Sequence, residues 1–332
     1  MAEQALKNLN LENLTKEGRI FRPSLPSRQG QEKTAGRVFF VLSIIPVVLV
    51  IAVTVALFVR TWPILQQHSL WELISGTVWK PMKGQFGFWP FITGTFWVTA
   101  VGVGLAIPPC LLTAIYLSEY ARASIRAMMK PLLDLLAAIP SVVYGVWGMI
   151  VIVPLVGNTL RPAFDRWLGF IPLFASNQPT GFSILSGGIV LAVMIAPFII
   201  AVIYEVLRTV PEGLRHASLG LGATHWQTIR HIILRQTLPG VIAGIVLGTS
   251  RALGETMAVL MVVGNVPQVP KSIFDAAYPL PALIANNYGE MMSIPLYDAA
   301  LLGAALMLLV IILIFNIAST LVLQRMLGKN WV

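Results

Sequence analysis

One stretch of the sequence carries charged residues where the centre of a lipid bilayer would be. Residues 239–263 are apolar and long enough to cross a membrane, yet Arg251 lies near their middle and Glu255 follows one turn later. Positions i and i+4 share a helix face, so the two charges are predicted to pair. A charge at mid-membrane costs roughly 3 to over 10 kcal/mol and must therefore face protein or water. The pair indicates either a polar pathway or a buried structural salt bridge.

The side-chain types indicate what such a pathway would carry. A guanidinium group donates several hydrogen bonds in a fixed geometry, which suits a compact anion with several oxygens. Thr256 directly follows Glu255 and is a further candidate for contact with the anion. Ser141 and Tyr144 are open candidates for the same role.

The same stretch carries a stripe of small residues. Gly240, Gly244, Gly248, Ala252 and Thr256 recur every four residues, and such a stripe lets another helix pack closely. The predicted helix is therefore packed on one side and lines a polar path on the other.

A polar hairpin over residues 205–238 precedes this stretch. Pro211 suits a first helical turn, Gly220 and Gly222 would end that helix, and Thr224 with Gln227 resembles a capping box that starts a second one. Just before the bend, Ala217 and Ser218 form a small-residue surface that another protein could approach closely. An ordinary loop is the alternative interpretation.

Three segments carry a resemblance to a known family. His216-Ala217-Ser218, Gly222 and Ile232-x-Leu234 follow the spacing of the EAA loop of ABC importer permeases, with His216 in place of the usual glutamate and Arg235 in place of the usual proline. The strings RALGETMAV (251–259) and LLAAIPSVVYGVWG (135–148) are similar to segments of phosphate importer permeases. The long polar N-terminus resembles the PstC-type member of their heterodimeric pair.

The resemblance implies a type I ABC importer transmembrane domain. It implies three kinds of protein partner: a homologous PstA-type permease, two PstB-type ATPase subunits that hold ATP and Mg, and an external PstS-type phosphate-binding protein. His216, Ala217, Ser218 and Gly222 would couple this chain to the ATPase subunits. Arg251 would contact phosphate, and Glu255 would keep that contact from becoming too tight. The chain itself is expected to bind no cofactor.

Composition independently places the chain in a membrane. Of its 332 residues 56% are hydrophobic and 11% charged, and the mean hydropathy is +0.78, which excludes an ordinary soluble domain. The predicted fold class is an all-α integral membrane protein in contact with lipid. Its six transmembrane helices are predicted at residues 38–59, 91–118, 131–156, 183–204, 239–263 and 296–323, with a kink at Pro140 in the third.

Charge predicts the orientation of the spans. The side with both termini and the hairpin holds 16 Lys and Arg residues, and the opposite side holds 6. This bias predicts that the tail (1–36), the coupling loop (205–238) and the C-terminus (325–332) are cytoplasmic. The resemblance implies a bacterial plasma (inner) membrane. Asp134, near the start of the third predicted span, is expected to cap that helix.

Several other functions lack their sequence signals. The chain has no GxxxxGK[ST] loop for ATP, no metal-binding histidine spacing, and no basic segment interleaved with aromatic residues for nucleic acid. One alternative is an autonomous ion-coupled anion transporter or channel in which Glu255 or Asp134 titrates. An intramembrane enzyme is another, but it would need a nucleophile or metal set that the sequence does not present.

Overall fold

A computed structural model describes residues 25–175, 180–290, 294 and 296–328. Residues 1–56 and 57–332 form two separate units. Most of the predicted N-terminal tail and the last four residues of the predicted C-terminus lie outside the described residues. The first unit contains the N-terminal part of helix α3 (Leu25–Gln67), along which apolar side chains from Val38 to Val55 are exposed. A membrane or a partner protein would cover such a helix.

The second unit contains the rest of α3 and is otherwise helical apart from one small hairpin. Its α-helices are α4 (Leu70–Ser75), α5 (Trp89–Ile115), α6 (Ala123–Ala138), α7 (Ser141–Trp147), α8 (Val153–Leu155), α9 (Arg161–Leu168), α10 (Ile184–Arg208), α11 (Glu212–Gly220), α12 (His225–Thr228), α13 (Leu234–Leu253), α14 (Met257–Leu260), α15 (Leu280–Asn287) and α16 (Tyr297–Gly328). Four π-helical segments are η2 (Tyr116–Tyr120), η3 (Gly148–Ile152), η4 (Val156–Leu160) and η5 (Ile229–Ile233), and η1 (Pro81–Lys83) is a 3-10 turn. The strands β1 (Trp79–Lys80) and β2 (Gln85–Phe86) pair antiparallel.

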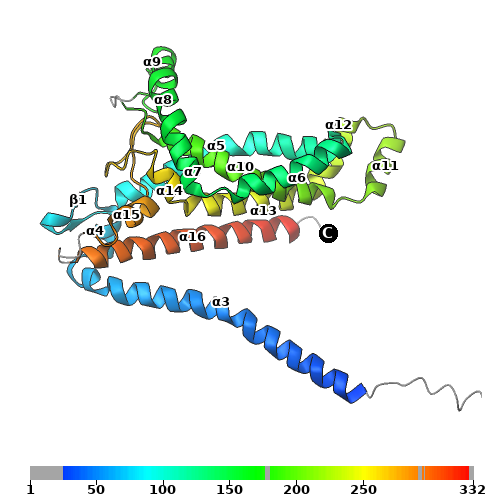
Figure 1. The fold of residues 1–332 in the computed structure, drawn as a ribbon, viewed down its shortest axis with the longest axis horizontal. Helices are drawn as coiled ribbons and strands as arrows, with labels where there is room; N and C mark the ends of the chain where they lie inside the picture. The colour runs from blue at the N-terminus through cyan, green and yellow to red at the C-terminus, as the bar shows by residue number, and fades with distance from the viewer. Residues whose placement is uncertain (1–24, 176–179, 291–293, 295, 329–332) are drawn as a thin grey trace, which may run out of the picture. The chain divides into compact units, whose positions relative to one another are not determined.

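Helix α10 lies at the centre of the second unit. It packs against α5, α6 and α13, and α13 also packs against α16 (Figure 1). Sixteen of its 25 residues are buried, including Ile195, Ile199, Ile203 and Leu207, which are fully covered. A helix that is apolar around most of its circumference is stable only when other helices surround it, so α10 holds the bundle together.

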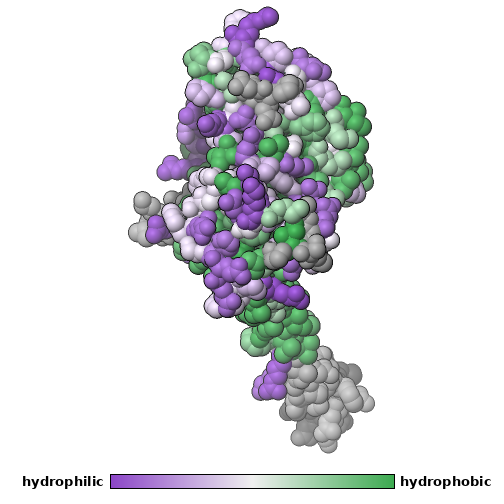
Figure 2. Space-filling view, turned by 90° about the vertical axis from the view of Figure 1, so that its left-hand side faces the viewer, coloured by the Kyte–Doolittle hydropathy of each residue, from purple (hydrophilic) through white to green (hydrophobic). Residues whose placement is uncertain are grey.

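The two ends of the bundle differ. Helices α11 and α12 lie at one end, and α4, β1 and α15 lie at the other (Figure 1). Hydrophilic residues gather over the end that carries α4, β1 and α15, while hydrophobic residues form a patch on one flank (Figure 2). Polar ends separated by an apolar belt are what a bilayer requires of a protein that crosses it.

Six helical segments are long and apolar enough to cross a membrane, at Ala35–Gln67, Trp89–Tyr120, Ser141–Leu168, Ile184–Arg208, His225–Leu253 and Tyr297–Arg325. The predicted fold class, an all-α membrane protein with six spans, is confirmed. Pro140 interrupts the chain between α6 and α7, where the sequence predicts a kink, because the residue before a proline disfavours helical geometry. Asp134 lies inside α6 and not at a helix start, so the predicted cap is wrong.

The fifth span departs most from its predicted bounds. The sequence predicts a helix over residues 239–263, whereas the observed segment runs from His225 to Leu253 and ends there. Gly254 caps the helix, and the four-residue α14 begins only at Met257. Apolar residues resume at Met257, so hydropathy averaged over the whole stretch could not locate this break.

Candidate functional site

Arg251 lies in the last turn of α13, beside two other membrane helices. Its guanidinium carbon is 5.6 Å from the centroid of the Phe198 ring on α10, and its charge acts on Tyr144 of α7. Tyr144 is buried, and its hydroxyl donates a 2.9 Å hydrogen bond to the Leu136 carbonyl. The Arg251 side chain is exposed in the isolated chain. A cation over an aromatic face keeps its N–H donors free for an anion.

The predicted pairing of Arg251 with Glu255 is corrected by the structure. Because α13 ends at Leu253, the two residues no longer share a helix face, and no ion pair found among the described residues joins them. Glu255 Oε1 instead accepts a 3.2 Å hydrogen bond from the Ala258 amide at the start of α14. Thr256 is half-buried, and its hydroxyl donates to the Gly254 carbonyl at 3.3 Å. Both side chains thus stabilise the break after α13.

The glycine stripe of α13 packs against α10 of the same chain. A Cβ atom at Gly240 would lie 2.5 Å from Val206, one at Gly244 2.9 Å from Val202, and one at Gly248 2.5 Å from Ile199. Close helix packing is therefore observed. The helix that packs against the stripe is α10 of the same chain.

The hairpin has the two helices that the sequence predicts. Helix α11 ends at Gly220, and Gly222 has φ +85°, a conformation that favours glycine. The Thr224 side chain accepts a hydrogen bond from the Gln227 amide while the Gln227 side chain accepts one from the Thr224 amide, so the capping box is confirmed. The second helix then continues through η5 into α13, which joins the hairpin directly to the segment that carries Arg251.

The tip of the hairpin is exposed and partly apolar. His216 and Ala217 are exposed, whereas Ser218 is half-buried and its hydroxyl lies 2.9 Å from that of the buried Thr228. No residue of α11 is classed as buried. Four large apolar side chains are exposed on and beside the two short helices, at Leu214, Leu219, Leu221 and Trp226. An apolar surface on an otherwise polar hairpin is typical of a protein-binding site.

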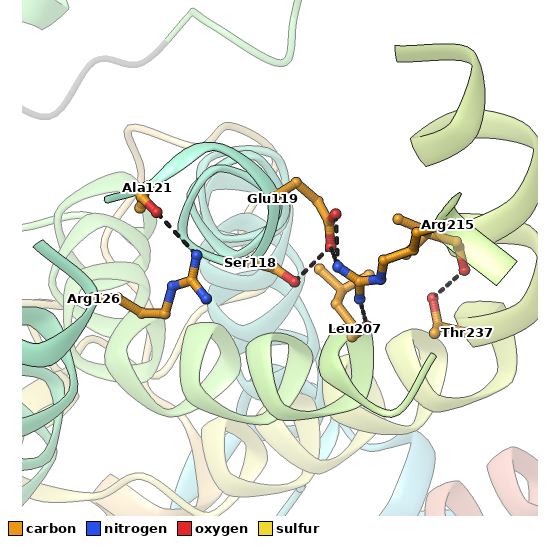
Figure 3. Close-up of polar contacts among 8 residues, drawn as sticks. Ser118, Glu119, Ala121, Arg126, Leu207, Arg215 and Thr237 are labelled. Atoms are coloured by element: carbon orange, nitrogen blue, oxygen red, sulfur yellow. Dashed lines mark hydrogen bonds and ion pairs between the residues drawn. The ribbon is translucent and has the colours of Figure 1, made fainter. Parts of the chain in front are cut away.

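An ion pair that sequence reasoning missed joins this hairpin to the bundle. Arg215 Nη1 lies 2.9 Å from both carboxylate oxygens of Glu119, which ends the second span, and Arg215 Nη2 donates to the Leu207 carbonyl at 2.9 Å (Figure 3). The Ser118 hydroxyl adds a 2.7 Å hydrogen bond to Glu119. The available signal was one glutamate at the end of an apolar run, because such a charge needs a partner when it is buried.

Burial makes this pair different from a surface salt bridge. The Glu119 side chain is only 3% exposed and that of Arg215 20%, so removing one partner would leave a buried charge and cost about 3–5 kcal/mol. The Lys130–Glu205 pair at 3.0 Å is 66% and 56% exposed, so water screens it and it contributes little to stability. The hydrogen bond to Glu205 and the charge of that carboxylate raise the pKa of Lys130 above its usual value.

The residue types that ligate metals are scattered over the part of the chain that the structure describes. Within those residues no group of three or more His, Cys, Asp or Glu side chains could hold a metal ion. The one cysteine, Cys110, is buried in α5.

The fold and the hairpin define a multi-pass membrane protein with an exposed element for protein contact. Residues 110–328 match the family described as binding-protein-dependent transport system inner membrane component. The chain belongs to this family. It is thus a permease subunit of an ABC transporter and works with an ATPase and a binding protein.

Individual relatives agree with this membership. The chain is 34% identical over 282 residues to the phosphate transport system permease protein PstC of Haemophilus influenzae, covering 84% of this chain and 89% of that protein. It is also 34% identical to the probable ABC transporter permease protein YqgH of Bacillus subtilis, over 92% of this chain and 95% of that one. A chain in the crystal structure of a bacterial ABC transporter that imports alginate has the same fold, with TM-score 0.56, 14% identity, and coverage of 90% of this chain and 99% of that one.

Proposed function

We propose that this chain is the membrane-spanning permease subunit of an importer that moves inorganic phosphate into the cytoplasm at the expense of ATP. The observation that carries the proposal is Arg251, an exposed arginine in a membrane span without an ion-pair partner among the described residues. A permanent positive charge within a membrane span needs water or an anion beside it. Its place in a chain similar to phosphate permeases favours phosphate.

Arg251 acts by donating charge-assisted hydrogen bonds to the passing anion. Phe198 supports the guanidinium on one side, and Tyr144 adds a polar group nearby. Because Glu255 is turned to the α14 amide, it does not neutralise Arg251 in this conformation. A single cation without a cage of further donors binds weakly, and weak binding suits a site that must also release its substrate.

The hairpin is the docking element for the ATPase. Its exposed Leu214, Leu219, Leu221 and Trp226 offer apolar contact, and His216, Ala217 and Gly222 lie along the tip. Two PstB-type subunits hold ATP and Mg, so this chain hydrolyses nothing itself. A PstA-type permease completes the pathway, and a PstS-type protein delivers phosphate from outside.

The orientation follows from charge and from the hairpin. The ends rich in Lys and Arg are cytoplasmic, which places both termini and α11–α12 inside the cell and α4, β1 and α15 outside. The membrane is the bacterial inner membrane.

Uptake of labelled phosphate by the reconstituted complex tests this proposal. Vesicles are prepared with the ATPase, partner permease and binding protein, with and without internal ATP, and with sulfate or molybdate as competitors. Uptake that needs ATP and the binding protein and that resists sulfate supports it. Phosphate uptake without ATP would instead indicate an ion-coupled carrier, and transport of another anion would refute the substrate assignment.

A further inference from the structure

Within the described residues, helix α11 of the hairpin has few attachments to the bundle. Helix α11 buries no side chain completely, so packing alone does not fix its position. Polar or ring contacts supplement this packing at three places among the described residues. They are the Arg215–Glu119 pair, the Ser218–Thr228 hydroxyl contact, and an edge-to-face contact at 4.9 Å between Tyr120 and His225.

Only the first of these three contacts connects α11 to two membrane spans at once. Arg215 reaches η2 through Glu119 and the C-terminal turn of α10 through the Leu207 carbonyl (Figure 3). Ser218 and Thr228 both belong to the hairpin and its continuation, so their contact only holds the hairpin together. Tyr120 and His225 join the second span to α12 and not to α11.

We propose that Arg215 and Glu119 form the linkage that transmits movement of the ATPase-bound hairpin to the second and fourth spans. This inference rests on the proposed coupling role of the hairpin. A buried pair in which one guanidinium nitrogen contacts both carboxylate oxygens is short and costly to break, so the two elements move together when one is displaced. Helix α10 packs on both α5 and α13, and the displacement therefore reaches the Phe198–Arg251 contact.

Arg215 and Glu119 are positioning residues, since neither lies beside Arg251 in the pathway. A purely structural role predicts that their loss lowers the yield of the complex and reduces uptake and ATP hydrolysis in proportion. A linkage predicts that the two activities separate. The ratio of phosphate transported to ATP hydrolysed distinguishes these two roles.

The test uses the full reconstituted complex and three variants. Arg215→Gln and Glu119→Gln each leave one polar group buried without its partner, whereas Arg215→Lys keeps the charge but loses the planar fork that binds the carboxylate and Leu207 together. Lys130→Gln is the matched control, because it removes an exposed salt bridge between α6 and α10. The inference expects phosphate transported per ATP to fall by roughly tenfold in the first three, a typical size for coupling between two sites, and to stay at the wild-type value in the control.

Each outcome decides the question. A wild-type ratio in assembled Arg215→Gln and Glu119→Gln complexes overturns the inference, as does a proportional loss of both activities. If the two glutamine variants do not assemble, the ratio in Arg215→Lys decides in the same way. Vesicles that contain the unmodified complex are measured in parallel. If the proposed function itself is wrong, these vesicles show no ATP-dependent phosphate uptake, so the two failures can be distinguished.

Discussion

Arg251 shows how one residue can carry a functional argument although its predicted partner is wrong. The side chain lies at the end of α13, over Phe198, and Glu255 is bound to a backbone amide. The arginine is therefore a cation available for contact in this chain. Arg251 thus becomes the main residue of the proposed anion contact, whereas Glu255 becomes a residue that stabilises the break after α13.

Replacing Arg251 by glutamine should lower phosphate uptake at least about tenfold while the complex still assembles. Charge-assisted hydrogen bonds contribute about 1.5–3 kcal/mol each, so the loss of one slows transport roughly tenfold or more. Uptake of labelled phosphate measures transport, and co-purification of the partner subunits measures assembly. Normal uptake by Arg251→Gln would refute the pathway role.

Glu255→Gln is the matched control for this experiment. Its amide oxygen can still accept the hydrogen bond from Ala258, and no salt bridge to Arg251 is lost. Uptake should stay within about threefold of wild type, which corresponds to less than about 1 kcal/mol. A loss as severe as that of Arg251→Gln would mean that the two charges do pair during transport.

At the level of the element, the contact between α10 and α13 explains why glycine recurs on α13. Val206, Val202 and Ile199 of α10 lie where side chains of larger residues at Gly240, Gly244 and Gly248 would be. The two backbones approach closely only because these side chains are missing. The stripe thus stabilises this chain itself.

Gly244→Leu should destabilise the chain by forcing α13 away from α10. Overpacking of a close contact costs about 1–3 kcal/mol, and the variant should have a lower Tm and a lower yield. Thermal unfolding of the purified complex measures this. The control is Gly104→Leu on α5, where no atom lies within 4 Å of the added Cβ. An unchanged Tm for Gly244→Leu would contradict the packing account.

The bend of the hairpin leads to a separate prediction. Gly222 has φ +85°, whereas proline fixes φ near −65°, so Gly222→Pro must rebuild the turn between α11 and α12. Phosphate transported per ATP should fall, by roughly tenfold if the full coupling free energy is lost. Gly213→Ala in α11, which meets no atom within 4 Å, controls for a change on the same hairpin. A wild-type ratio in Gly222→Pro would argue against this hairpin as the coupling element.

For the whole molecule, the testable property is its orientation in the membrane. The hairpin end is predicted to face the cytoplasm, and the end with α4, β1 and α15 the outside. Ser124 near the start of α6 and Met82 in η1 are exposed at these two ends, and Met82 is 82% exposed. Single cysteines at these positions report the side directly.

In a Cys110→Ser background, Met82→Cys should react with a membrane-impermeant thiol reagent in intact spheroplasts. Ser124→Cys should react only after the membrane is permeabilised. The Cys110→Ser replacement removes the one native thiol of the chain, which is 1% exposed, so the introduced cysteine is the group that reacts. Reaction of Ser124→Cys in intact cells would reverse the assigned orientation.

The sequence by itself was sufficient for the properties that depend on local composition. Apolar length predicted six spans, Thr224 and Gln227 predicted the capping box, and Gly220 with Gly222 predicted the end of α11. These features are decided within a few residues by helix length, hydrogen bonding to the nearest amides, and backbone freedom. The family motifs could be recognised for the same reason, because each is a short stretch of sequence.

Only the tertiary structure decided which groups meet across the chain. Glu119 and Arg215 are 96 residues apart, and the partner of the glycine stripe lies in a helix that no spacing on α13 identifies. The break at Gly254 likewise depends on where Glu255 finds a donor, since the apolar residues that resume at Met257 do not show whether the helix continues across residues 254–256. Pairing of distant groups follows from how helices pack. The periodicity of one helix does not identify the helix that packs against it.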